Sequence, residues 1–181
     1  IADFNASTLS YIGLIKEGKK MSEEILVIGS LNMDQVMRIS RLPIMGETLA
    51  GAGDLRLVPG GKGANQAVAI ARLKGKVTMA GRVGDDPFGH QLIQGLQADG
   101  IGTDLIVSDP QSASGVAFIF LSPKGENAII ISPGANGQVG RDQEQHERIL
   151  SKLDTVQMVV MQLEIPLESV LTYIQEAKAR G

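Results

Sequence analysis

The sequence predicts an α/β fold in which helices cover a mainly parallel sheet. Three observations support this prediction. Short, almost entirely apolar segments of strand length recur along the chain, and segments with apolar residues at helical spacing alternate with them. Two further regions are rich in β-forming residues joined by turn-forming residues. These regions indicate a small second sheet of antiparallel strands.

The first elements of the parallel sheet follow one another closely. Residues 25–29 are nearly all apolar, as expected of a strand that is buried on both faces. Residues 65–73 carry small apolar side chains at helical spacing, and residues 77–83 return as a strand. Asp-Pro at 86–87 is a helix-start signal, and Gly100 is placed to end that helix. This order predicts strand, helix, strand and helix.

The last elements repeat the pattern. Residues 156–161 indicate a further buried strand, and Pro166 begins a helix. The chain stops at Gly181, where such a helix leads into the next strand of a parallel sheet. We therefore expect the C-terminal half of the fold to be missing. The apolar face of the last helix comprises Leu167, Val170, Leu171, Ile174 and Ala177.

The predicted second sheet combines two pairs of strands. Residues 115–121 and 127–132 form a hairpin around a Ser-Pro-Lys-Gly-Glu turn, and residues 35–39 and 55–58 form another pair. A sheet that projects from the carboxyl ends of the main strands is suitably placed to act as a lid over a pocket.

Composition excludes several classes of function. The net charge is −3 and no Lys/Arg-rich run is present, so nucleic acid is not expected as a partner. The chain has no cysteine and two isolated histidines, which excludes disulfides, Cys-ligated zinc and a multi-histidine metal site. No apolar run approaches the roughly 20 residues of a membrane span. We expect a cytoplasmic protein without a membrane partner.

The N-terminal residues differ from the rest of the chain. The lysines within residues 1–20 follow the apolar stretch instead of preceding it, unlike the order in a signal peptide. The chain begins with Ile1, whereas Met21 stands directly before the first strong strand. We interpret residues 1–20 as a non-native or fused leader, and residues 21–181 as the folded part.

The glycine-rich segment 59–67 leads directly into a helix. Consecutive glycines expose backbone N–H groups that a polar ligand can approach closely. No Ser or Thr follows Lys62, so the segment is not a Walker loop, and Gly29 does not begin a dinucleotide fingerprint. A phosphate loop, a structural turn and a sugar-binding loop all remain possible readings of this segment alone.

Four stretches in order resemble the ribokinase-like, or PfkB, family of carbohydrate kinases over nearly all of residues 25–181. The resemblance implies a Rossmann-like three-layer sandwich with a small β-sheet lid, whose strands lie near residues 35–58 and 115–132. Lys74 departs from the family pattern, which usually has a small residue there. The matching stretches are Gly29-Ser30-Leu31-Asn32-Met33-Asp34, Gly60-Gly61-Lys62-Gly63-Ala64-Asn65-Gln66-Ala67, Val83-Gly84-Asp85-Asp86 and Met161-Gln162-Leu163-Glu164.

The resemblance also implies a sugar-binding site. Carboxylates at strand ends accept hydrogen bonds from sugar hydroxyls, and glycine backbone and amide or ammonium side chains complete the contacts. Each residue also has a purely structural alternative: a turn cap, a surface ion pair or a helix entrance. The implied substrate-binding residues are Asn32, Asp34, Gly60, Gly61, Lys62, Gly63, Asn65 and Glu164.

The activity implied by the resemblance is transfer of the ATP γ-phosphoryl group to the 5-hydroxyl of a pentose, with D-ribose favoured. ATP, Mg²⁺ and a monovalent cation such as K⁺ would serve the complete enzyme, and its general-base aspartate is expected outside this chain. The lid faces favour a homodimer. Alternatives are a non-catalytic sugar-binding module, a kinase of a related sugar or nucleoside, and a dehydrogenase domain.

A Gly-Ala-Gly-Asp sequence at 51–54 matches the family's catalytic motif but lies at the wrong place. In the family the motif begins a helix, whose N-terminus helps to form an anion hole. Here the residues after Asp54 are expected to form a strand. We therefore interpret Asp54 as a turn residue of the lid.

Overall fold

The computed structural model describes residues 23–181, so the expected leader and Met21 lie outside the described residues. Its main sheet, sheet A, is parallel throughout and has the strand order β5-β4-β1-β8. This arrangement confirms the predicted parallel sheet. The strands are β1 (Glu24–Ile28), β4 (Lys76–Gly84), β5 (Gly102–Asp109) and β8 (Met158–Met161).

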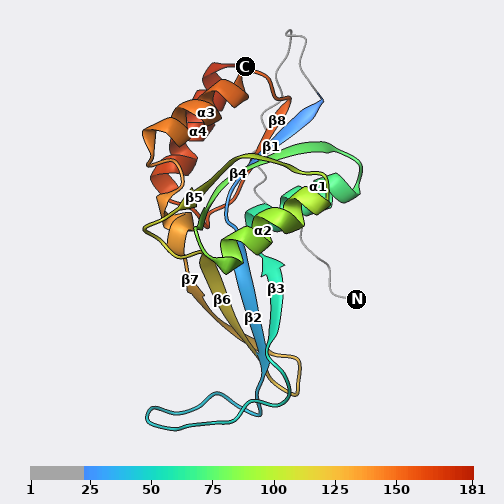
Figure 1. Cartoon of the computed structure of the whole chain (residues 1–181), viewed down its shortest axis with the longest axis vertical. Helices are drawn as coiled ribbons and strands as arrows, with labels where there is room; N and C mark the ends of the chain where they lie inside the picture. Colours follow the sequence, from blue (N-terminus) through green and yellow to red (C-terminus); the bar gives the residue numbers. More distant parts are fainter. Residues whose placement is uncertain (1–22) are drawn as a thin grey trace, which may run out of the picture.

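Helices cover both faces of sheet A (Figure 1). Alternate residues of β1 serve two separate cores: Leu26 and Ile28 pack with α3 and α4, whereas Val27 packs with α1 and α2. The predicted three-layer sandwich is therefore confirmed. The helices are α1 (Lys62–Arg72), α2 (Pro87–Ala98), α3 (Gln143–Leu153) and α4 (Leu167–Ala179).

The second sheet, sheet B, projects from the end of sheet A at which β1 runs on into β2 (Figure 1). Its order is β3-β2-β6-β7, with both outer pairs antiparallel as predicted. The central pair β2–β6 is parallel, so the sheet is mixed instead of wholly antiparallel. The strands are β2 (Asn32–Arg38), β3 (Arg56–Gly60), β6 (Gly115–Leu121) and β7 (Asn127–Ser132).

Hydrogen bonds around Asp86 tie sheet B to sheet A. Asp86 caps α2, as predicted, by accepting a hydrogen bond from Gly89 N at 2.8 Å. It also accepts bonds from Ser114 N at 2.7 Å and Ser114 Oγ at 2.8 Å, directly before β6. These bonds outweigh the effect of burial and lower the pKa of Asp86. The start of β6 is thereby fixed to the start of α2.

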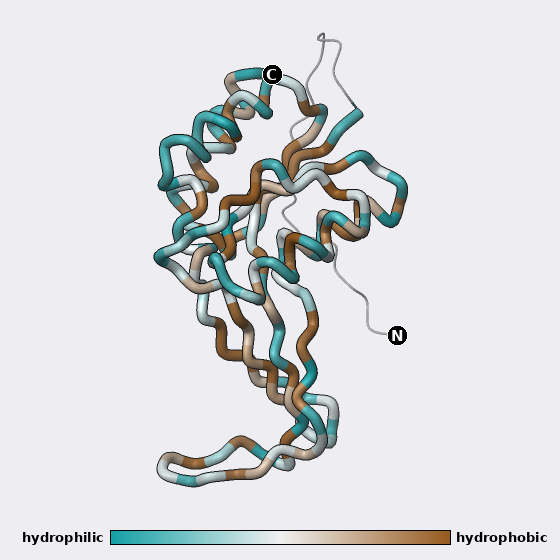
Figure 2. The backbone as a smooth tube through the Cα atoms, in the orientation of Figure 1, coloured by the Kyte–Doolittle hydropathy of each residue, from teal (hydrophilic) through white to brown (hydrophobic). Residues whose placement is uncertain are grey.

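Apolar side chains remain exposed on sheet B and beside β8. Hydrophobic residues recur along the strands of sheet B (Figure 2). Ile130 on β7 is 63% exposed, and Phe118 lies opposite it on β6. Leu163 and Leu167 are exposed next to β8, which forms one edge of sheet A among the described strands. No helix of the described residues is long and apolar enough to cross a membrane.

Helix α1 ends in a conformation that suits glycine better than its own residue. Lys74 has a φ of 66°, the only positive φ of a non-glycine residue in the described chain. Its N–H bonds to Ala71 O at 2.8 Å and Gly75 N bonds to Ile70 O at 2.9 Å. These two bonds define a Schellman motif, whose left-handed position is usually glycine. Lys74, which departs from the family pattern, is therefore a strained residue just after α1.

We expect Lys74→Gly to raise the free energy of unfolding by about 1 kcal/mol, because the strain of the left-handed backbone is relieved. For a chain of this size the melting temperature should rise by about 2–4 °C, measured by circular dichroism. Lys74→Ala is the matched control, since it removes the side chain but keeps the Cβ. A melting temperature of Lys74→Gly no higher than that of Lys74→Ala would contradict this account.

Candidate functional site

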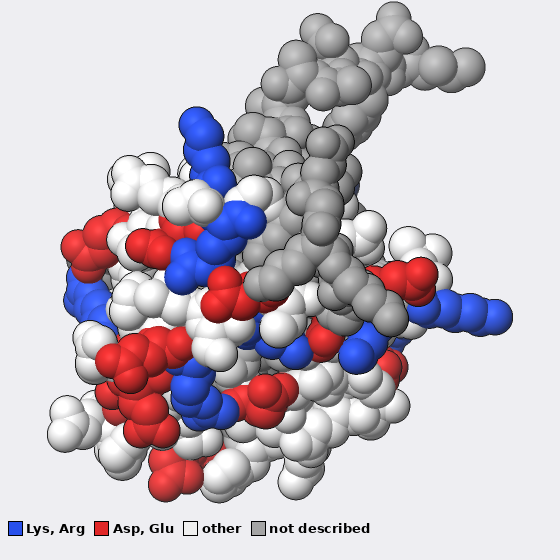
Figure 3. Space-filling view, turned by 90° about the horizontal axis from the view of Figure 1, so that it is seen from above, with Lys and Arg blue, Asp and Glu red and all other residues white. Residues whose placement is uncertain are grey.

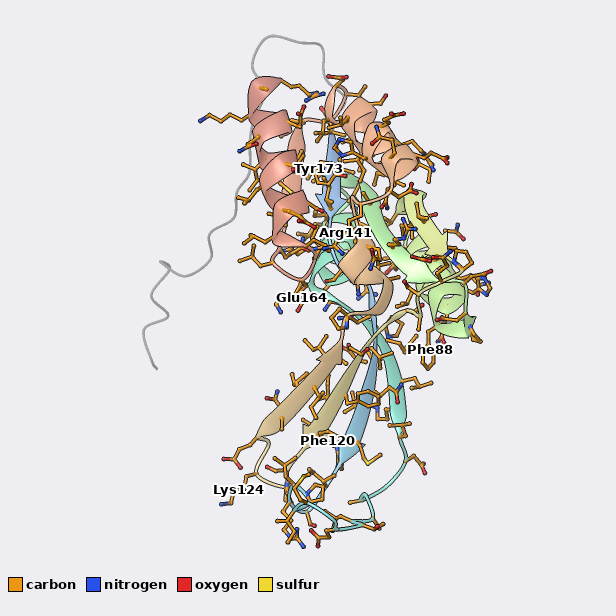
Figure 4. All side chains as sticks on the ribbon, turned by 90° about the vertical axis from the view of Figure 1, so that its left-hand side faces the viewer. Phe88, Phe120, Lys124, Arg141, Glu164 and Tyr173 are labelled. Carbon is orange, nitrogen blue, oxygen red and sulfur yellow. The ribbon has the colours of Figure 1, made fainter. Side chains whose placement is uncertain are left out.

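Three connections meet where sheet A passes into sheet B. They are the β1–β2 connection, the junction of β3 and α1, and the segment that follows β8. Glu164 lies at this junction, between the helices and sheet B (Figure 4). The carboxyl ends of parallel strands are the usual place for ligand sites in α/β folds. Seven of the eight predicted residues are brought into this region by the contacts described below, and Asn65 is the exception.

Glycine allows the β3–α1 junction to lie directly on the β1–β2 connection. Gly61 has a φ of 93°, and a Cβ there would come within 2.8 Å of both Asn32 N and Ser30 O. A Cβ on Gly63 would lie 2.7 Å from Ser30 N. No other residue type fits these two positions without moving the backbone. The glycines therefore allow two backbone segments to pack closely beside the candidate site.

Glu164 is held by three hydrogen bonds. Its Oε2 accepts bonds from Ser30 Oγ at 2.7 Å and Lys62 N at 3.1 Å, and its Oε1 pairs with Lys62 Nζ. Burial opposes ionisation, but the bonds from Lys62 and Ser30 outweigh it and lower the pKa of Glu164. Glu164 is thus an oriented, ionised carboxylate with one further acceptor position for a ligand.

Asp34 is a half-buried carboxylate on β2. It stands over Gly60, where a Cβ would come within 2.3 Å of Asp34 Oδ2. No residue from 23 to 181 donates a hydrogen bond to this carboxylate. Burial, and secondly the negative charge of Glu164, raise the pKa of Asp34. The Asp34 carboxylate is therefore a hydrogen-bond acceptor without a donor among the described residues. It lies close enough to Glu164 for the two negative charges to interact.

Asn32 is buried and oriented by a residue that sequence analysis missed. Asn136 donates from Nδ2 to Asn32 Oδ1 at 2.8 Å and to Leu31 O at 2.9 Å, and its Oδ1 accepts from Leu31 N at 2.9 Å. A Cβ on Gly115 would collide with both asparagine side chains. Asn136 lies in the 3₁₀ helix η1 (Gly134–Gln138). The Gly-Ala-Asn stretch after an apolar strand is the sequence feature that could have indicated Asn136.

Lys62 and Asn65 are both exposed on the first turn of α1, but their surroundings differ. Lys62 reaches Glu164, whereas Asn65 lines a hollow of about 510 Å³ between α1, α2 and β3. Val58 and Pro59 of β3 form another side of this hollow. Asn65 is thus the one predicted side chain for which no contact with the Asp34–Glu164 region is observed.

Charged side chains of both signs lie on the surface of the molecule. On the face shown in Figure 3, acidic and basic side chains are interspersed, and the visible described atoms form no basic stripe. No three His, Cys, Asp or Glu side chains of the described residues gather to hold a metal ion. Residues 51–54 precede strand β3 and begin no helix, as predicted for the Gly-Ala-Gly-Asp sequence.

Comparisons of the sequence with known proteins identify similar proteins. The model of the pfkB family of carbohydrate kinases matches residues 22–181. A ribokinase of Schizosaccharomyces pombe is 44% identical over 162 residues, which are 87% of this chain and 50% of the relative. A deoxyribokinase of Salmonella typhi is 40% identical over 158 residues, which are 87% of this chain and 51% of the relative.

Solved structures give the same result for the fold. The structure of Arabidopsis thaliana ribokinase complexed with ribose and ATP has a TM-score of 0.76 and 31% identity. The match covers 89% of this chain and 52% of that chain. The chain thus spans about half the length of the relatives that it matches.

Proposed function

This chain belongs to the pfkB family of carbohydrate kinases, and on that premise we propose that it forms the sugar-binding part of an ATP-dependent kinase that phosphorylates D-ribose at the 5-hydroxyl. The similarity to ribokinases supports ribose. The similarity to a deoxyribokinase supports 2-deoxyribose as the second candidate.

The observation that carries the proposal is Asp34, a half-buried carboxylate with no donor among the described residues. Two neighbouring sugar hydroxyls supply the two donors that such a carboxylate lacks. Glu164 would accept a further hydroxyl, and Lys62 Nζ, which has three N–H donors, would donate to a sugar oxygen besides Glu164. The glycines would let the sugar approach the backbone closely. This combination orients a polyol without requiring it to carry charge.

We assign no nucleotide-binding residues in the described part of the chain. No described cluster of acidic side chains fits Mg²⁺, and residues 51–54 do not begin the helix that an anion hole needs. ATP, Mg²⁺ and K⁺ therefore have no sites that we assign within residues 23–181. The chain's own groups bind and orient the sugar, and we derive no step of phosphoryl transfer from them.

Titration calorimetry of the chain with ribose, 2-deoxyribose and adenosine tests the proposal. We expect ribose to bind more tightly than 2-deoxyribose, because a site that pairs with both hydroxyls loses a bond to the deoxy sugar. Tighter binding of 2-deoxyribose or of adenosine would favour a related kinase. No binding of any of the three would contradict the sugar-binding function.

Asp54 is expected to have no part in the reaction. Residues 21–181 alone should turn over no ATP in the presence of ribose, because neither base nor anion hole is assigned in them. Asp54→Asn should leave ribose affinity unchanged in titration calorimetry. Ribose-dependent ATP turnover by the chain that disappears in Asp54→Asn would overturn this assignment and make residues 51–54 catalytic.

We further propose that the protein forms a homodimer through sheet B, because Phe118 and Ile130 together expose an apolar patch there. Light scattering at micromolar concentration should give twice the mass of one chain, and Ile130→Glu should reduce it to one. Leu73→Glu, at an apolar residue 84% exposed after α1, is the matched control and should stay dimeric. A monomeric parent chain would argue against this proposal.

A further inference from the structure

Two pairs of side chains, one behind the other, connect α1 with the segment after β8. The outer pair is Lys62 with Glu164. The inner pair is Gln66 with Gln162, whose Nε2 donates to Gln66 Oε1. Gln66 follows Lys62 by four residues and so lies one turn further on the same face of α1. Leu163, which separates Gln162 from Glu164 in the sequence, is 77% exposed.

Gln162 fills the space between the backbone at the end of β1 and the backbone at the start of α1. It is 9% exposed, and a Cβ on Gly29 would come 1.9 Å from its Oε1 and 2.9 Å from Gly63 Cα. The side-chain amide therefore occupies the gap that the two glycines leave between the end of β1 and the start of α1. Its position sets how closely α1 approaches the strand end.

The amide oxygen of Gln162 is buried and has no hydrogen-bond donor among the described residues. Leaving a buried acceptor unpaired is unfavourable, and a methionine or leucine would fill similar space without that cost. What the amide adds is a directional bond to Gln66. Gln162 thus combines an amide oxygen that lacks a donor within residues 23–181 with one directional bond to Gln66. A role in positioning α1 explains this combination better than core packing does.

We infer that Gln162 and Gln66 form a positioning pair that holds α1 against the β8 end and so sets the geometry of Lys62 and Glu164. The inference rests on the proposed sugar-binding role of that site. Neither glutamine contacts the sugar in this account. They act through the bonds that Glu164 accepts from Lys62 N and Lys62 Nζ.

The test uses Gln162→Met and Gln66→Met, which keep the side-chain length but remove the amide. Carbon-13 NMR follows the titration of the Glu164 carboxyl, with Glu164→Gln used to assign its signal. The pKa of Glu164 should rise in both variants, because the bonds from Lys62 that lower it are loosened. Lys62 and Asp34 are the other charged groups that face Glu164.

Ribose affinity provides the second measurement and should fall about tenfold in each variant. The double variant should lose little more than either single variant, because both remove the same bond. Gln143→Met is the matched control and should change neither measurement. Among residues 23–181 the Gln143 side chain bonds only to Glu147, at the surface of α3.

The possible outcomes separate this inference from the proposed function. If Gln162→Met does not fold, Gln66→Met still tests the pair, since Gln66 is only partly buried. An unchanged Glu164 titration in the folded variants would overturn the positioning role. If the parent chain binds no ribose, the proposed function fails, while the titration of Glu164 still decides whether the glutamine pair positions it.

Discussion

Asp34→Ala is expected to lower the affinity for ribose by about 30-fold or more, equivalent to about 2 kcal/mol. The reason is the arrangement around this carboxylate: it is half-buried and no described residue donates to it. Hydrogen bonds to an ionised acceptor are stronger than those between neutral groups, and two sugar hydroxyls would be left without a partner. Titration calorimetry at neutral pH measures the loss directly.

The stability of the Asp34→Ala variant separates binding from folding. Burial and the charge of Glu164 raise the pKa of Asp34, so the ionised carboxylate destabilises the folded state above that pKa. Removing it should leave the free energy of unfolding at neutral pH unchanged or higher. A variant that loses ribose affinity only because it unfolds would not support the binding role.

The dependence of affinity on pH gives an independent check. Ribose binding should weaken as the pH falls through the pKa of Asp34, which lies above its ordinary value of 3.8. Glu164, whose pKa is lowered, remains ionised to lower pH. Asp34→Asn should bind more weakly and lack the step that belongs to Asp34. Asp54→Ala, at an exposed carboxylate beside β3, should bind like the parent chain. Equal affinities of the parent chain and Asp34→Ala would refute the assignment.

Strongly patterned elements could be predicted from the sequence, and weakly patterned ones could not. The hairpin strands 115–121 and 127–132 have the predicted bounds, because a glycine-containing turn separates two β-rich runs. Strand β5 was not predicted, since Thr103, Asp104 and Ser108 interrupt its apolar residues. The bounds of helix α3 were not predicted either, although His146 was expected to lie in a helix, because α3 consists mostly of charged and amide residues. The few apolar residues of α3 were too weak a signal to define the helix.

The candidate site shows the same division. Asp34 and Glu164 could be found because they follow strands within recognisable stretches of sequence. Asn136 could not, because its role depends on a 3₁₀ helix that folds back onto Leu31, 105 residues earlier. Gln162 lay inside a recognised stretch, but its position in the gap between Gly29 and Gly63 appears only in the folded chain. Contacts across the sheet depend on packing that local sequence does not encode.

Gly61→Ala should cause the largest loss of stability. The φ of 93° with ψ of 137° at Gly61 belongs to a region that L-residues with a side chain scarcely occupy, at a cost of about 1–3 kcal/mol. The new Cβ would also lie 2.8 Å from both Asn32 N and Ser30 O, backbone atoms that cannot rotate away. Forced shifts of packed atoms cost about 1–3 kcal/mol more. Together we expect a loss of about 3–5 kcal/mol.

Urea unfolding followed by circular dichroism measures this loss, with Gly95→Ala as the matched control. Gly95 lies within α2, and a Cβ there meets nothing within 4 Å, so alanine should stabilise the helix by up to about 1 kcal/mol. The same chemical change is thus expected to have opposite signs at two glycines. The free energy of unfolding of Gly61→Ala could instead lie within about 1 kcal/mol of that of the parent chain. In that case the β3–α1 junction does not pack on the β1–β2 connection as described. The close approach that places Lys62 beside Glu164 would then lose its physical basis.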